Sequence, residues 1–104
     1  MKEIIERVIK FRDEREWMQF HTPENLAKAI NIEAAELLEN FLWNNEFDKE
    51  KVCEELADVM VYCINMADVL DVDIKDIINK KLDKNEKKYP VEKAKGNSKK
   101  YTEL

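Results

Sequence analysis

An all-α fold is predicted by three features of the sequence. The 104 residues include one Gly and two Pro, which is too few for a fold rich in tight turns. Apolar residues make up 44% of the chain and recur at the three- and four-residue spacing typical of helices. The length suits one modest core. We therefore expect a single all-α domain over residues 1–104.

The first half of the chain predicts two helices. Apolar residues at helical spacing, beginning with Ile4, favour a helix over about residues 2–19. Thr22 is a good N-cap, and Pro23 suits the first position of a helix. We therefore expect the second helix to run from Pro23 to about Trp43.

Two further helices and a tail are expected after a connector at 44–48. The third helix spans about 48–70, and Asp73 is the expected N-cap of the fourth. Pro90 disfavours helix at the residue before it, so the fourth helix ends there. Residues 91–104 are expected to form an extended C-terminal arm.

The charge distribution excludes some classes of partner. Residues 1–79 carry 9 basic and 19 acidic residues, a net −10, whereas residues 80–104 carry 9 and 4, a net +5. An acidic body does not suit a nucleic acid polymer. No apolar run reaches the roughly 18 residues of a membrane span, and the start lacks a signal peptide's apolar block. A cytoplasmic protein is expected, whose basic tail is either a solvated end or a partner for a small polyanion.

Two pairs of acidic residues are predicted to face inward. Glu33 and Glu36 lie three residues apart on the second helix, as do Glu55 and Asp58 on the third. At 100° per residue, both pairs project among apolar neighbours, whereas Glu39 belongs to the polar face. Ionised carboxylates are seldom buried without a partner.

Two kinds of partner could compensate these acids. One is an ion pair with an arginine of the first helix, Arg7, Arg12 or Arg15. The other is a hard divalent cation such as Mg²⁺, which takes oxygen ligands. Two matching pairs on successive helices favour the metal. A di-iron or zinc centre is excluded because His21 is the one histidine and the cysteines lack ligand spacing.

These motifs resemble a known family. "EAAELLE", followed nineteen residues after Glu36 by "EELADVMVY", is similar to the ExxE…ExxD signature of the MazG-like, all-α nucleoside triphosphate pyrophosphohydrolases. The flanks "FRDEREWMQFHTPENLAKAI", "ENFLW", "NEKKYP" and "SKKYTEL" resemble the dCTP pyrophosphatase branch. The resemblance covers essentially the whole chain.

The resemblance implies a four-helix MazG-like bundle with a basic C-terminal arm (about 91–104), assembled as a homodimer or a homotetramer. It implies Mg²⁺-dependent hydrolysis of a (deoxy)nucleoside triphosphate to the monophosphate and pyrophosphate, in nucleotide-pool housekeeping. By motif, the metal ligands are Glu33, Glu36, Glu55 and Asp58, and Glu33 or Glu36 orients the attacking water. The substrate residues are Trp17, Gln19, His21 and Trp43 for the base, and Tyr62, Asn85 and Lys88 for sugar or phosphates.

Two questions stay open from the sequence. The dCTP-hydrolysing relatives carry a histidine where this chain has Val8, so the preferred base, dCTP-like or modified, is not decided. The alternative to an enzyme is a non-catalytic helical module whose acidic stripes bind a basic partner. Helices that are apolar on most sides also favour self-association, because so short a chain cannot cover them all.

Overall fold

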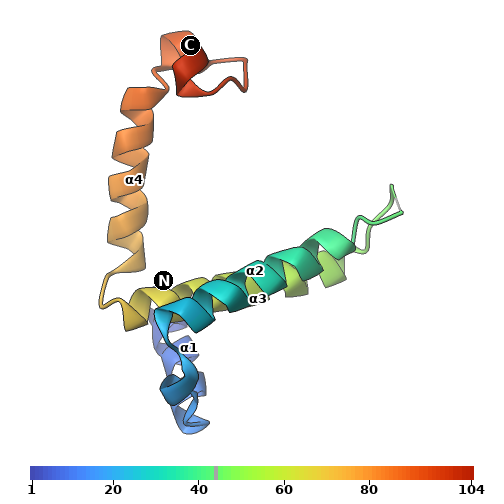
Figure 1. Ribbon diagram of the computed structural model, residues 1–104, viewed down its shortest axis with the longest axis vertical. Coiled ribbons are helices and arrows are strands. Elements are labelled where there is room, and N and C mark those ends of the chain that lie inside the picture. Colours follow the sequence, from blue (N-terminus) through green and yellow to red (C-terminus); the bar gives the residue numbers. More distant parts are fainter. Residues whose placement is uncertain (44) are drawn as a thin grey trace. The chain divides into compact units, whose positions relative to one another are not determined.

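The computed structural model describes residues 1–43 and 45–104, so Asn44 of the predicted connector lies outside the described residues. These residues form helices joined by turns and loops, with no strand among them, which confirms the all-α prediction (Figure 1). They divide into two compact units, Met1–Asp71 and Val72–Leu104, and each unit is described by itself. The expectation of one domain, with all four helices in one bundle, stays a prediction.

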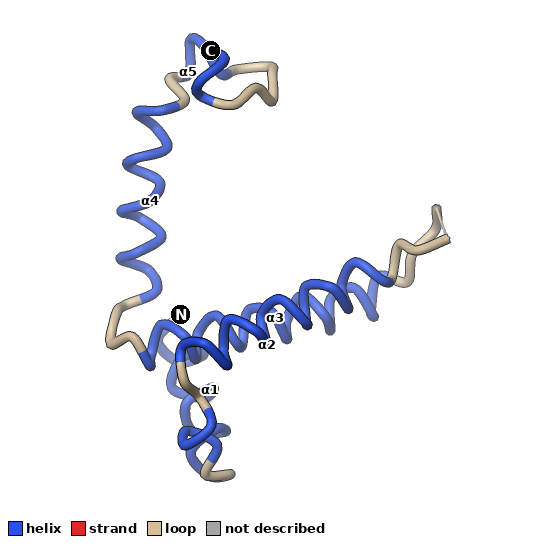
Figure 2. The backbone as a smooth tube through the Cα atoms, in the orientation of Figure 1, coloured by secondary structure: helices blue, strands red, loops and turns tan. Residues whose placement is uncertain are grey.

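An antiparallel helix pair dominates the first unit. Helix α2 (Pro23–Glu39) and helix α3 (Lys49–Val69) lie side by side for most of their length, joined by the connection at 40–48 (Figures 1 and 2). Helix α1 (Lys2–Glu14) packs across α3, and the 3₁₀ helix η1 (Trp17–Phe20) leads from α1 to α2. The three helices predicted for this part of the chain are therefore present, with differences at two of their ends.

Local side-chain caps explain where the helices begin. The Thr22 Oγ1 accepts a hydrogen bond from the Asn25 N–H at 3.1 Å, and Pro23 follows at the first helical position. The Asp73 carboxylate accepts from the Lys75 N–H at 2.8 Å. Both predicted N-caps, Thr22 and Asp73, are confirmed.

The core of the first unit lies where α1 meets one end of the α2–α3 pair. Leu26, Ile64 and Ala67 are its buried apolar residues. Arg12 is buried beside them, and its Nη1 lies 2.6 Å from the Asp68 carboxylate. Asp13 supplies a second carboxylate at 2.9 Å from the Arg12 Nε. A buried guanidinium is tolerated there because both of these carboxylates face it.

Two helix ends differ from the prediction, and the backbone gives the reason. Residue Glu16 has φ 54°, which ends the first helix at Glu14 and sets Trp17–Phe20 into a separate 3₁₀ turn. Helix α2 ends at Glu39 rather than near Trp43: from Asn40 on, the backbone N–H groups bond to carbonyls three residues back, and Trp43 at φ 61° then ends this turn. A left-handed residue cannot continue a right-handed helix, and helical periodicity carries no signal for such a break.

The second unit consists of helix α4 (Ile74–Lys88) and a folded C-terminal segment. The residues after Pro90 are basic as predicted, but they are not extended throughout. They form the short helix α5 (Val91–Ala94), a turn at Gly96 with φ 82°, and the 3₁₀ helix η2 (Tyr101–Glu103). Only glycine adopts that φ without strain, so Gly96 permits the reversal.

Large apolar side chains remain exposed on the first unit. Leu38 on α2 is 70% exposed, Met60 on α3 is 51% exposed, and Trp43 in the connection is 94% exposed. Scattered exposed apolar residues are ordinary, but several along one helix pair leave an apolar surface that packing within this unit does not cover. Among the described helices, none is both long enough and apolar enough to span a membrane.

Candidate functional site

Acidic side chains from α2 and α3 converge between the two helices. One carboxylate oxygen from each of Glu33, Glu55 and Asp58 lies within 4.8 Å of the others. Glu36 joins them, since it is within hydrogen-bonding reach of both Glu33 and Glu55. The structure therefore brings together the four acids that the sequence singled out, which we call the acid cluster.

The helix geometry explains the convergence. Residues three apart share one face of a helix, so each pair presents two carboxylates in the same direction. Because α2 and α3 run antiparallel side by side (Figure 2), their two acidic faces can meet between the helices. Glu33 and Glu55 are half-buried, whereas Glu36 and Asp58 stay exposed in the single chain, contrary to the inward orientation expected for them.

The electrostatics of the cluster are unfavourable without a cation. Loss of solvent, a hydrogen bond with Glu36 and the neighbouring carboxylates raise the pKa of Glu33 to about 7. Desolvation and the charge of Glu36 also raise the pKa of Glu55. In addition, the Oε2 atoms of Glu33 and Glu55 are buried without a hydrogen-bond partner. These orphaned oxygen atoms fit a hard divalent cation.

The arginine alternative is not supported. Arg12 is committed to Asp13 and Asp68, and Arg15 donates to the Phe11 carbonyl oxygen at 3.0 Å and stacks over its ring. Within the described residues of the first unit, 1–43 and 45–71, no ion pair joins a lysine or arginine to any member of the acid cluster. In that part of the chain, the four carboxylates therefore lack a protein cation within ion-pair distance.

An open pocket of about 390 Å³ adjoins the cluster, lined by Glu36, Glu39, Asn40 and Glu55. Glu39 is exposed, as its place on the polar face predicts, yet it borders the same pocket as two members of the cluster. The Asn40 side-chain amide donates to the carbonyls of Glu36 and Leu37, so it closes the end of α2. This pocket gives solvent and ligands access to the carboxylates.

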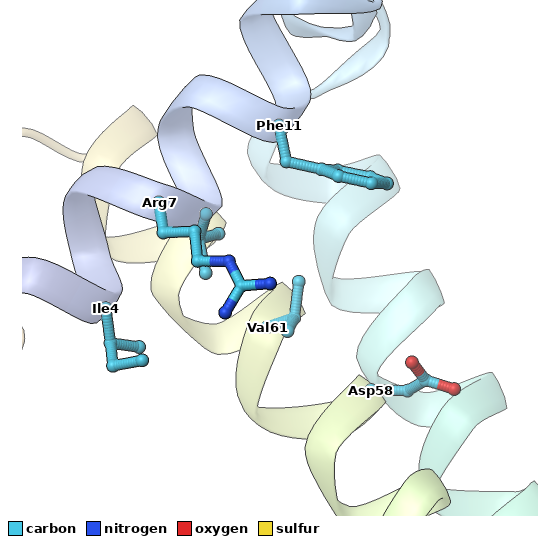
Figure 3. A pocket seen from close by; sticks show the side chains of 6 residues that line it. Ile4, Arg7, Phe11, Asp58 and Val61 are labelled. Atoms are coloured by element: carbon cyan, nitrogen blue, oxygen red, sulfur yellow. The ribbon is translucent and has the colours of Figure 1, made fainter.

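A second, mainly apolar pocket of about 360 Å³ reaches the cluster from α1. Figure 3 shows Ile4, Arg7 and Phe11 of α1 facing Val61 and Asp58 of α3, and Val8 completes the lining. The Arg7 guanidinium and the Asp58 carboxylate thus border one cavity. The sequence suggested Arg7 only as an ion-pair partner. Its spacing of four from Phe11 on one helix face was the available signal.

A third pocket, of about 440 Å³, brings together three predicted substrate residues. Trp17, His21 and Tyr62 line it together with Phe20, Asn25, Leu26 and Ala29. Trp17 packs edge-to-face on Phe11 with ring centroids 5.7 Å apart, and His21 lies 6.5 Å from the Tyr62 ring. Asn25, which sequence reasoning missed, holds η1 to α2 through its bond to the Phe20 carbonyl at 3.1 Å.

The chemistry of His21 in this pocket is that of a neutral imidazole. Desolvation, together with the charge of Arg12, lowers the pKa of His21 below its ordinary 6.5. Its Nδ1 is buried without a hydrogen-bond partner. A neutral imidazole with a free ring nitrogen can recognise one donor or acceptor on a ligand.

Two other predicted substrate residues of the first unit, Gln19 and Trp43, do not line these pockets. Gln19 donates from its side chain to the Glu16 carbonyl at 2.8 Å and so stabilises the turn before η1. Trp43 projects into solvent at the far end of the helix pair. Asn85 and Lys88 belong to α4, in the second unit.

The fold and the cluster together define a class of protein. It is an all-α protein with two acidic pairs that fit a divalent cation and with pockets of about 390 and 360 Å³ beside them. The chain belongs to the MazG-like family, because the sequence model of that family matches residues 28–104.

Named relatives agree with this assignment. The chain is 37% identical to dCTP pyrophosphatase 1 of Mus musculus and of Homo sapiens over 105 residues, which cover 91% of this chain. It spans 62% of the length of those relatives. It also resembles the crystal structure of a pyrophosphatase from Archaeoglobus fulgidus DSM 4304, with a TM-score of 0.77 and 41% identity, covering 86% of this chain and 92% of that one.

Proposed function

We propose that this chain hydrolyses a (deoxy)nucleoside triphosphate to the nucleoside monophosphate and pyrophosphate, with Mg²⁺ bound at the acid cluster. The observation that carries the proposal is the approach of the Glu33, Glu55 and Asp58 carboxylates to within 4.8 Å, with buried oxygen atoms left unpaired. Relatives named as pyrophosphatases support the same activity.

Each residue of the acid cluster has a proposed role in the reaction. Glu33, Glu36, Glu55 and Asp58 would hold the metal. When bound, Mg²⁺ supplies charge neutralisation on the triphosphate and acidifies a water ligand. Glu33 or Glu36 would orient the attacking water or accept its proton.

The base is proposed to bind in the pocket lined by Trp17, His21 and Tyr62. The indole face can stack on a nucleobase, which contributes roughly 1–3 kcal/mol per base. Neutral His21 can add one hydrogen bond. A dCTP-like or modified nucleotide is the proposed substrate, with Val8 and Arg7 in the neighbouring pocket as the contacts that would tune the choice.

We propose further that the chain assembles as a homodimer or a homotetramer. The exposed apolar residues of α2, α3 and their connection supply the surface for a second copy. A partner would also shield Glu36 and Asp58, which are exposed in one chain. The proposed setting is the cytoplasm, where the enzyme would remove unwanted nucleotides from the pool. Light scattering that returned a monomer at micromolar concentration would contradict the assembly.

A nucleotide panel tests the activity. Each canonical deoxynucleoside triphosphate and 5-methyl-dCTP is incubated with the protein, with and without Mg²⁺, and pyrophosphate release is measured. We expect Mg²⁺-dependent release that falls at least a hundredfold in Glu36→Gln. The matched control is Glu24→Gln, which removes an exposed carboxylate from the first turn of the same helix and should retain the wild-type rate.

The panel also separates the enzyme from the other class. Release of pyrophosphate from no nucleotide would overturn the proposed activity and favour a non-catalytic module whose acidic stripes bind a basic partner. Equal rates for wild type and Glu36→Gln would leave the activity standing but remove it from the acid cluster.

A further inference from the structure

Arg7 differs from the other two arginines of the chain in its side-chain contacts. Arg12 is held by two carboxylates, and Arg15 is held by the carbonyl oxygen and the ring of Phe11. Within the described residues of the first unit, by contrast, the Arg7 side chain forms no hydrogen bond or ion pair. Arg7 is also exposed, so its five N–H donors are available to a dissolved anion.

The packing of α1 directs Arg7 into the cavity that Asp58 borders. Ile4, Arg7 and Phe11 are three and four residues apart, so they share one face of α1. That face lies against α3, and Figure 3 shows the Arg7 side chain extending toward Val61, with Asp58 about one turn earlier on α3. A guanidinium and a member of the acid cluster therefore line one cavity of about 360 Å³ within the first unit.

The charge of the acid cluster creates a need for a cation beside it. Four ionised carboxylates outweigh the charge of one divalent cation, and a triphosphate adds further negative charge. Of the three pockets described above, only the one lined by Arg7 contains a lysine or an arginine. Apart from Asp58, the rest of its lining is apolar, which strengthens the field of the guanidinium there. Arg7 can thus offset negative charge that a metal leaves uncompensated.

We propose that Arg7 binds the phosphate chain of the nucleotide where that chain passes from the acid cluster into this pocket. The inference rests on the proposed function, in which Arg7 tunes the choice of nucleotide, and it names the group that Arg7 contacts. A triphosphate bound at the cluster lies next to Asp58, which borders the pocket with Arg7. The planar guanidinium can donate two parallel hydrogen bonds to phosphate oxygens, which favours a phosphate over an uncharged group.

Calorimetric titration tests the contact without turnover. Inorganic triphosphate and α,β-imido-dCTP, which cannot be cleaved between its α and β phosphates, are titrated with Mg²⁺ into wild type and Arg7→Met. The Kd of both ligands should rise about tenfold in Arg7→Met, because hydrogen bonds between charged groups are lost. The matched control is Lys10→Met. Lys10 is exposed on the same helix and lines none of the three pockets, so this change should keep the wild-type Kd.

A second variant, Arg7→Lys, separates charge from hydrogen-bonding geometry. The ammonium keeps the positive charge but lacks the planar pair of donors, so its Kd should lie between those of wild type and Arg7→Met. In the pyrophosphate-release assay, KM for the preferred nucleotide should follow the same order. Arg7 is exposed, and both replacements favour helix, so circular dichroism should show the wild-type helix content in each variant.

The outcomes distinguish this inference from the activity beneath it. An active wild type whose Kd for both ligands is unchanged in Arg7→Met would overturn the role of Arg7 alone. A rise confined to α,β-imido-dCTP would assign Arg7 to the base or sugar and would also overturn it. Equal rises in Arg7→Met and Lys10→Met would reduce the effect to net charge, with the same consequence. A wild type that neither binds these ligands nor releases pyrophosphate from any nucleotide would overturn the proposed function and this inference with it.

Discussion

Replacing Glu33 with Gln should stabilise the metal-free chain at alkaline pH. Glu33 binds its proton more tightly in the folded chain, where its pKa is about 7, than in the unfolded chain, where the ordinary value is 4.5. The folded state therefore has its full advantage below pH 4.5 and loses it as the pH rises through about 7. Glu55, whose pKa is also raised, acts in the same direction.

The size of the effect follows from the same values. Moving one pKa from 4.5 to about 7 corresponds to roughly 3 kcal/mol if it is fully expressed. Solvent reaches the cluster, because Glu36 and Asp58 are exposed, so screening should leave roughly 1 kcal/mol. For a chain of this length, that free energy corresponds to a change in Tm of about 4–8 °C.

The assay is thermal unfolding in EDTA at a series of pH values from 5.5 to 8. Wild type should lose stability relative to Glu33→Gln as the pH rises, and the variant should melt about 4–8 °C higher at pH 8. Glu24→Gln controls for the loss of one negative charge elsewhere on α2. Identical melting of wild type and Glu33→Gln at pH 8 would refute the account of repulsion in the cluster.

Three further predictions concern the metal, the connection and the core. Mg²⁺ should raise the Tm more at pH 8 than at pH 5.5, because its ligands must be deprotonated, and an equal rise at both pH values would contradict the site. Trp43→Gly should not lower the Tm, since residue 43 is 94% exposed at φ 61°. The same change should raise the KM for the nucleotide about five- to a hundredfold, because the family resemblance assigns Trp43 to the base, on which an indole can stack. An unchanged KM would remove Trp43 from the site. Asp68→Ala should cost about 2–3 kcal/mol in urea unfolding by leaving buried Arg12 with Asp13 alone, and adding Arg12→Met should recover part of it; a loss under 0.5 kcal/mol would show that the pair is not structural.

Most of the helical architecture follows from the sequence because local chemistry specifies it. Thr22 and Asp73 cap helices where capping residues are expected, and apolar periodicity locates the helices between them. The break at Glu16 and the left-handed Trp43 in the turn after α2 could not be predicted, because neither residue has a local preference for that backbone.

The acid cluster was predictable for a related reason, whereas its exposure was not. A spacing of three places each pair on one helix face, and two such faces on successive helices can meet. Rotation about a helix axis says which residues share a face, but not whether another chain covers it. Glu36 and Asp58 are therefore exposed in one chain although their neighbours are apolar.

The residues that line the pockets and the fold of the C-terminal turn could not be predicted from the sequence. Arg7 lines a cavity with Asp58 only because α1 packs across α3, and sequence spacing within α1 cannot specify that crossing. Tyr101 reaches Lys88 through a turn whose Gly96 and Asn97 are ordinary loop residues in the sequence. Contacts between segments distant along the chain were thus the information that the sequence lacked.

The core of the first unit and the acid cluster lie at different positions along the α2–α3 pair. Leu26, Ile64 and Ala67 hold α2 and α3 in register at one end, and the acid cluster lies between them and the connection at 40–48. A slip of one turn would displace one acid pair from the other by about 5.4 Å, too far to share an ion. Because the register is set away from the connection, a peptide inserted there should leave the four carboxylates aligned.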